Sequence, residues 1–169
     1  MGEAYLLLGG NLGDREQYLE TATKRIKEHC GAVIRMSSIY ESEPWGFKDN
    51  RDFLNQVIVI HTELDPHRLL GEVLKIEDSM GRKRIPDKMV SRKIDIDILF
   101  YGEHIVEDAK LKIPHPRLQE RRFVLMPLLE IAPELKHPVL KKTMRELYSE
   151  CPDKLRVSSY FDRSLLPKY

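Results

Sequence analysis

Two aspartates, Asp95 and Asp97, lie in a stretch from Ser91 to Phe100 that alternates apolar and polar residues. This alternation predicts a half-buried strand, because successive side chains of a strand point to opposite faces. The two carboxylates would share one face, about 7 Å apart at a rise of about 3.3 Å per residue. Aspartate is a poor strand former, and a divalent cation would offset the repulsion; Mg²⁺ prefers such oxygen ligands. A solvated strand face is the simpler alternative for any Asp-x-Asp pair.

A second feature is a basic segment that directly precedes this stretch. Against the single acid Asp87 it carries Arg82, Lys83, Arg84, Lys88, Arg92 and Lys93. The formal net charge of the whole chain is only +1. One concentrated basic segment in a near-neutral protein favours a local anionic ligand over a general coating of nucleic acid. A solvated basic loop would have the same composition.

Glu77 lies on the apolar face of a predicted helix that follows the N-cap Asp65 and runs to Met80. At about 100° per residue, its position falls in the same arc as Val73 and its apolar neighbours. A carboxylate there needs a partner or a place at the rim of a cleft. A side chain at the edge of the stripe that bends into water is the alternative.

Phe53, Asn55 and His115 have side chains that could recognise a ligand. Phe53 and Asn55 share one face of the predicted strand Phe53–Thr62, where the ring could stack on a flat heterocycle and the amide could read its edge. Core packing is the ordinary role of such a phenylalanine. His115 lies between two prolines that restrict its backbone, although most loop histidines are simply solvated.

The elements that must position these residues follow from hydrophobic periodicity and turn residues. We predict strands at Ala4–Gly9, Val33–Tyr40, Phe53–Thr62 and around Asp95, helices at 15–30, 66–80, Phe123–Ile131 and Thr143–Glu150, a loop at Glu41–Asp52 with exposed Trp45 and Phe47, and a hairpin through Ile105–Glu107. Pro127 should kink its helix or start a new segment. The order predicts an α+β, ferredoxin-like βαββαβ core, an antiparallel-rich sheet with helices packed on it, plus C-terminal helical elements. The polar tail after Cys151 gives no signal.

Bulk properties limit the class of protein. A chain of 169 residues with 41% hydrophobic content predicts a single domain over residues 1–169. Two cysteines are too few for a disulfide framework, and neither a signal peptide nor a membrane-length apolar run is visible. We therefore expect a cytoplasmic protein that does not bind membranes. A monomer is our working expectation, which these bulk properties do not determine.

Several motifs recur in the order of a known family. They are Leu8–Gly13, Ser37–Gly46, Phe53–Asn55 and Ile76–Glu77 before Gly81–Arg82, and most specifically Arg92–Leu99, Pro114–Arg117 and Arg122–Leu128. With these motifs the chain resembles the 6-hydroxymethyl-7,8-dihydropterin pyrophosphokinase family of folate biosynthesis over almost its whole length. The resemblance implies transfer of pyrophosphate from ATP to the hydroxymethyl group of 6-hydroxymethyl-7,8-dihydropterin, with release of AMP.

The resemblance also implies roles for individual residues. Asp95 and Asp97 would hold two Mg²⁺ ions with ATP, and the catalytic residues would be Arg82, Arg92 and Asp97. ATP would be bound by Glu77, Arg82, Arg92, His115 and Arg121. The pterin would be bound by Ser42, Glu43, Trp45, Phe53, Asn55 and Phe123. The loops at 41–52 and 82–92 would close over the substrates during an in-line attack on the β-phosphorus.

Departures from the family pattern leave some contacts open. Phe53 stands where some members have Tyr, Met89 where some have an aromatic residue in the basic loop, and Leu74 where others have Gln. None of these departures involves the aspartate pair.

Two functions from other classes are compatible with the same elements. An RNA-binding module of this fold would need aromatic residues on its central strands, and the two aspartates would oppose RNA. A two-metal nucleotidyltransferase would share the aspartate pair, and spacing alone does not exclude it. Release of AMP rather than pyrophosphate from ATP would distinguish pyrophosphoryl transfer from nucleotidyl transfer.

Overall fold

A six-stranded sheet forms the centre of the computed structural model, which describes residues 2–81 and 93–160. The strands are β1 (Gly2–Gly10), β2 (Ala32–Met36), β3 (Tyr40–Ser42), β4 (Phe53–Thr62), β5 (Asp95–Tyr101) and β8 (Val157–Ser159). Their order is β5-β1-β4-β3-β8, with β2 also paired with β4, and these pairings are antiparallel. The predicted α+β class with its ferredoxin-like strand order is therefore confirmed.

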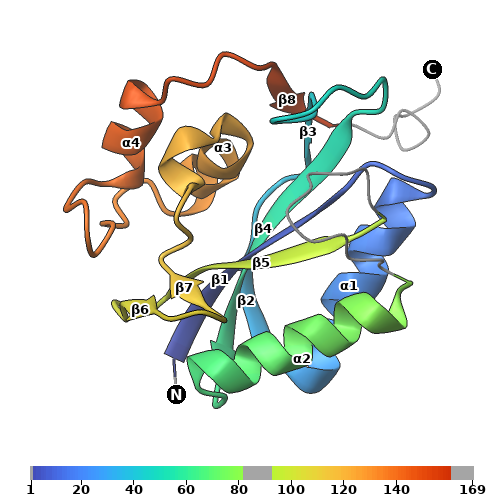
Figure 1. The fold of residues 1–169 in the computed structure, drawn as a ribbon, viewed down its shortest axis with the longest axis vertical. Coiled ribbons are helices and arrows are strands. Elements are labelled where there is room, and N and C mark those ends of the chain that lie inside the picture. The colour runs from blue at the N-terminus through green and yellow to red at the C-terminus, as the bar shows by residue number, and fades with distance from the viewer. Residues whose placement is uncertain (1, 82–92, 161–169) are drawn as a thin grey trace, which may run out of the picture.

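Helices cover both faces of this sheet (Figure 1). On one face, α1 (Arg15–His29) and α2 (Pro66–Ser79) pack over a core that includes Leu6, Leu8 and Ile96. On the other face, α3 (Arg122–Ile131) and α4 (Met144–Glu150) pack over a second core. Because both faces of β1 and β4 are buried, these strands are almost continuously apolar rather than alternating.

The starts of α1 and α2 agree with the capping residues Asp14 and Asp65 that the sequence offers. Asp14 accepts a hydrogen bond from the backbone of Gln17 at 3.2 Å, and Asp65 accepts one from the backbone of Arg68 at 2.8 Å. Thr143, which was predicted as the first residue of the last helix, instead caps α4 and forms a capping box with Glu146. The predicted hairpin is present as β6 (Val106–Glu107) and β7 (Lys112–Ile113), and a 3₁₀ turn (η1, Leu118–Glu120) precedes α3.

The prediction of one strand at Val33–Tyr40 is wrong, because the chain forms β2 and β3 with a break between them. At the break, the backbone N–H of Val57 donates to the hydroxyl of Ser37 at 3.0 Å instead of to a main-chain carbonyl. The backbone N–H of Ser38 donates to the Glu130 carboxylate on α3 at 2.9 Å. The Ser37 N–H still donates to the Val57 carbonyl at 2.8 Å, so one main-chain bond remains while side chains satisfy the neighbouring donors.

Two further expectations need correction. The tail after Cys151 is not featureless, since β8 adds an edge strand to β3. Helix α3 continues through Pro127 as one element, so of the two alternatives given for this proline the start of a new segment is wrong. Proline removes a single backbone hydrogen bond, to the carbonyl four residues earlier, and the buried packing of α3 tolerates that loss. Among the described helices, none has the length and apolar character needed to cross a bilayer.

Candidate functional site

A cavity of about 220 Å³ opens at the end of the sheet where β1 runs into the glycine-rich turn. It is lined by Leu7, Gly9, Ser42, Glu43, Trp45, Phe47, Phe53, Asn55, Asp95, Asp97, His115, Arg121 and Phe123. The structure therefore brings together all six predicted substrate-side residues, both aspartates, His115 and Arg121. We call this space the aromatic cavity.

The amide of Asn55 is held rigidly at the floor of the aromatic cavity. Its side chain is only 2% exposed, and its amide nitrogen donates to the hydroxyl of Ser42 at 2.8 Å. Gly9 on the adjacent strand approaches it closely, since a Cβ at Gly9 would meet the Asn55 carbonyl oxygen at 3.2 Å. Glycine at this position thus leaves room for the Asn55 amide. The sequence predicted only a turn at Gly9–Gly13 and not this close approach.

Aromatic rings from three segments line the same space. Phe47 and Phe53 meet edge to face, with ring centroids 6.0 Å apart. The Arg121 guanidinium lies 4.6 Å from the ring centroid of Trp45 and 5.8 Å from that of Phe123. Trp45 and Phe47 were expected to be exposed, but both are partly buried because they fold inward over the cavity.

The two aspartates project from β5 on the face predicted from the sequence. In the register of the sheet, Asp95 is opposite Gly9 and Asp97 is opposite Leu7. Ile96 points the other way, into the core under α1 and α2. Both carboxylates remain partly exposed and line the cavity, so the alternation found in the sequence does separate core from site.

A second cavity, of about 260 Å³, adjoins the first on the α2 side of β5. It is lined by Leu70, Leu74, Glu77, Asp95, Ile96, Asp97, Ile98, Lys110, Leu111, Lys112, His115 and Pro116. We call it the lysine cavity. Asp95, Asp97 and His115 line both cavities, so a ligand in each would meet its neighbour at these three side chains.

Glu77 is buried rather than bent into water. Its side chain is 1% exposed, and its carboxylate accepts a hydrogen bond from the backbone N–H of Ile96 at 2.8 Å. A carboxylate on the apolar face of a helix needs a polar partner, and Glu77 finds one in the backbone of the strand that carries the aspartates. Glu77 also lines the lysine cavity, where its predicted contact with a nucleotide would be made.

His115 is held in one orientation and in its neutral form. Its backbone N–H donates to the carbonyl of Leu99 at 3.0 Å, and its ring Nδ1 accepts from the backbone N–H of Arg117 at 3.2 Å. Burial lowers the pKa of His115 to about 4, with the cationic Arg121 acting in the same direction. Nδ1 is thus an acceptor, and the ring proton resides on Nε2.

Some predicted residues cannot be placed, and some lining residues were missed. Arg82, Arg92 and Met89 lie outside the described residues. Lys110 and Lys112 were not singled out, because two lysines beside a short hairpin strand carry no motif. Phe47 was named only as part of an exposed loop, and its inward position depends on long-range packing.

The chemistry of the aspartate pair fits magnesium. Among residues 2–81 and 93–160, no group of three or more His, Cys, Asp or Glu side chains is arranged to hold a metal by itself. Two carboxylates would therefore need further oxygen ligands from a bound phosphate and from water. Mg²⁺ is commonly held in this way, by one or two carboxylates together with substrate phosphates.

Comparison with known proteins gives matches over most of the chain. Residues 5–133 match the family described as 7,8-dihydro-6-hydroxymethylpterin-pyrophosphokinase (HPPK). The 2-amino-4-hydroxy-6-hydroxymethyldihydropteridine pyrophosphokinase of Aquifex aeolicus is 41% identical over 150 residues, which are 89% of this chain and 92% of that protein. The enzyme of the same name from Bacillus subtilis is 41% identical over 78% of this chain and 79% of its own length.

Longer proteins also match. The folic acid synthesis protein fol1 of Pneumocystis carinii is 41% identical over 88% of this chain but only 20% of its own length. A crystal structure of Plasmodium falciparum HPPK-DHPS with pteroate has a TM-score of 0.74 at 20% identity and covers 88% of this chain and 44% of that one. This structural likeness shows the fold alone, and the chain spans less than half of that structure.

The matches to full-length relatives define this chain as a transferase of the pyrophosphokinase class. More specifically, the chain belongs to the 7,8-dihydro-6-hydroxymethylpterin-pyrophosphokinase family, because the family match covers most of its length.

Proposed function

We propose that this chain transfers the pyrophosphoryl group of ATP to the hydroxymethyl group of 6-hydroxymethyl-7,8-dihydropterin and releases AMP, as a step of folate biosynthesis. Family membership supports the reaction. The observation that supports the placement of the site is the pair of adjoining cavities that share Asp95, Asp97 and His115. A flat heterocycle in one cavity and a nucleotide in the other would meet at the carboxylates.

The aromatic cavity suits the pterin. Phe53 and Phe123 offer ring faces for stacking, and Asn55, fixed by Ser42, presents its amide to the polar edge of the heterocycle. Glu43 and Trp45 come from the loop above. Because Asn55 is buried and already oriented, little conformational entropy is lost when the ligand binds.

The lysine cavity suits ATP. Leu70, Leu74 and Ile98 provide apolar surface for the base, whereas Lys110 and Lys112 provide positive charge near its edge. Leu74 gives the base no polar partner. Together with Glu77 and His115, these residues would direct the phosphates toward Asp95 and Asp97.

The hydroxymethyl oxygen of the pterin would attack the β-phosphorus in line with the departing AMP oxygen. Bound to Asp95 and Asp97, two Mg²⁺ ions would neutralise phosphate charge and favour ionisation of the attacking hydroxyl. Neutral His115 would donate a hydrogen bond from its Nε2–H to a phosphate oxygen and keep the proton, and Arg121 would add positive charge beside it. Asp97 could accept the hydroxyl proton. Arg82 and Arg92 are proposed to stabilise the charge that develops in the transition state.

A product assay tests this function. Purified protein is incubated with ATP, Mg²⁺ and the hydroxymethyl pterin, and the nucleotide products are separated. The expected product is AMP, in an amount that equals the pterin consumed. Pyrophosphate release without AMP would instead indicate a nucleotidyltransferase. Calorimetry with a non-hydrolysable ATP analogue, Mg²⁺ and the pterin, on the wild type and on Asp95→Asn, would show whether the carboxylate is needed to assemble the complex.

A further inference from the structure

The loop of residues 43–52 carries Trp45 and Phe47 over the aromatic cavity, and its two ends are held by Arg156, the residue directly before β8. The backbone N–H of Arg156 donates to the Glu43 carboxylate at 2.9 Å, and the Arg156 carbonyl accepts from the Glu43 backbone at 3.3 Å. The Arg156 guanidinium donates to the Asp52 carboxylate at 2.8 Å. Arg156 therefore joins the first and last residues of the loop.

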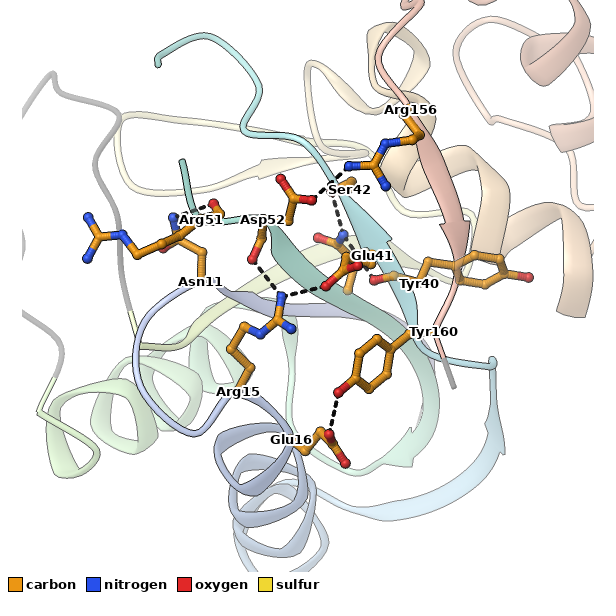
Figure 2. A network of polar contacts seen from close by, with 11 residues as sticks. Asn11, Arg15, Glu16, Tyr40, Glu41, Ser42, Arg51, Asp52, Arg156 and Tyr160 are labelled. Atoms are coloured by element: carbon orange, nitrogen blue, oxygen red, sulfur yellow. Dashed lines mark hydrogen bonds and ion pairs between the residues drawn. The ribbon is translucent and has the colours of Figure 1, made fainter. Parts of the chain in front are cut away.

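Two other elements converge on the same end of the loop (Figure 2). The Arg15 guanidinium, at the start of α1, donates to the Asp52 carbonyl at 2.9 Å and to the Glu41 carboxylate at 2.8 Å. The Asn11 amide donates to the carbonyl of Arg51 at 3.2 Å. Residues 51 and 52 are thus fixed immediately before Phe53, the first residue of β4 and a wall of the cavity.

The C-terminal strand is itself anchored to the sheet and to α1. The Tyr160 backbone N–H donates to the carbonyl of Ile39 at 2.9 Å, and its hydroxyl donates to Glu16 at 2.5 Å. The Arg15 guanidinium lies 5.6 Å from the Tyr160 ring centroid. Because the following strand is anchored, the backbone of Arg156 has a fixed position next to Asp52, although the two residues are 104 positions apart in the chain.

We propose that Arg156 is a positioning residue for the pterin side of the site, which it serves by fixing the ends of the 43–52 loop. This inference rests on the proposed function. The Arg156 side chain is 55% exposed, and partly exposed ion pairs contribute little to global stability. Its effect is therefore expected in the geometry of the loop, and hence in pterin binding, rather than in the free energy of unfolding.

Substitution kinetics test the proposal. In Arg156→Ala, KM for the pterin should rise about two- to fivefold, the size that one partly exposed ion pair can supply. KM for ATP, kcat and the unfolding midpoint should stay close to wild type. Arg156→Lys keeps the charge toward Asp52 and should recover part of the loss. Asp52→Ala should match Arg156→Ala, and the double variant should be no worse than either single one, because both remove the same contact.

A second readout does not depend on catalysis. Trp45 lies within the loop, and the sequence contains one tryptophan, so the intrinsic fluorescence of the protein reports on this loop. In Arg156→Ala, acrylamide should quench this fluorescence more efficiently and the emission should shift to the red. Arg145→Ala is the matched control, since Arg145 makes an exposed 3.0 Å ion pair with Glu134 and does not line either cavity.

The outcomes separate the two proposals. If the wild type forms no AMP, the proposed function fails, while the fluorescence comparison still tests the role of Arg156 in the loop. If the wild type is active but Arg156→Ala equals Arg145→Ala in pterin KM and in quenching, the positioning role is wrong. An equal rise in KM for both substrates, or a lowered unfolding midpoint that accounts for the loss, would also overturn it.

Discussion

The buried carboxylate of Glu77 accepts a hydrogen bond from the backbone N–H of Ile96, at a distance of 2.8 Å. Ile96 stands between Asp95 and Asp97, so an acidic side chain of α2 fixes the strand that carries both proposed metal ligands. Without this contact the buried N–H of Ile96 would have no hydrogen-bond acceptor from Glu77, which would cost folding free energy.

Replacement of Glu77 tests this contact. Glu77→Ala should lower the free energy of unfolding by about 1–3 kcal/mol, because it leaves the Ile96 N–H without its acceptor. AMP formation should fall as well, since β5 would lose its fixed position. Glu77→Gln keeps a carbonyl acceptor and should retain most of the stability. Urea unfolding and the AMP assay measure both effects; a stable and fully active Glu77→Ala would contradict the positioning of β5 by this residue.

The aspartate pair gives the largest expected effect on turnover. Asp97→Ala should lower AMP formation by several orders of magnitude, since the carboxylate would be lost from the point where both cavities meet. The fold should persist, because Asp97 is partly exposed and removal of one carboxylate relieves repulsion with Asp95. Circular dichroism checks the fold, and calorimetric titration with Mg²⁺ and an ATP analogue checks metal-dependent binding. Near-normal turnover would rule out the proposed role.

The sequence predicted those parts of the site whose side-chain direction follows from the local alternation of apolar and polar residues. The alternation around Asp95 placed both carboxylates on one face of β5, and the parity of Phe53 and Asn55 placed both in the aromatic cavity. Asp14, Asp65 and Pro66 located the starts of α1 and α2 for the same reason, since such residues act within one turn of helix.

The parts that sequence did not predict depend on contacts between distant segments. Strand β8 has only three residues and pairs with β3, which is far away in the chain. Three residues are too few for an alternating pattern that would predict a strand. At the break between β2 and β3 the chain contacts Glu130 of α3, and the inward-turned Trp45 lies against the Arg121 guanidinium. Such positions become visible only when the tertiary structure brings the partners together.

Removal of the Phe123 ring should weaken pterin binding without affecting ATP. In Phe123→Ala, the affinity for the pterin should fall by about 1–3 kcal/mol, the range seen when a nucleobase loses an aromatic partner. Phe123 lines the aromatic cavity and not the lysine cavity, so the affinity for an ATP analogue should be unchanged. Calorimetry with each ligand separately measures the difference. Equal weakening of both ligands would show a general disturbance of α3, and unchanged pterin affinity would remove Phe123 from the pocket.

Buried neutral histidines should make the protein sensitive to acid. His137 accepts hydrogen bonds at Nδ1 from the backbone N–H groups of Val139 and Leu140, at 3.1 and 3.0 Å, and burial lowers its pKa below the usual 6.5. The pKa of His115 is lowered to about 4.

The unfolded chain therefore takes up protons at a higher pH than the folded one, so the free energy of unfolding should begin to fall as the pH drops below about 6.5 and should decrease further toward pH 4. Urea midpoints measured between pH 7.5 and pH 4.5 would show this decline. His137→Gln should reduce its slope, because it removes one of these two histidines, whereas His29→Gln, at an exposed position on α1, should not. A slope that is unchanged in His137→Gln would mean that another group causes the loss.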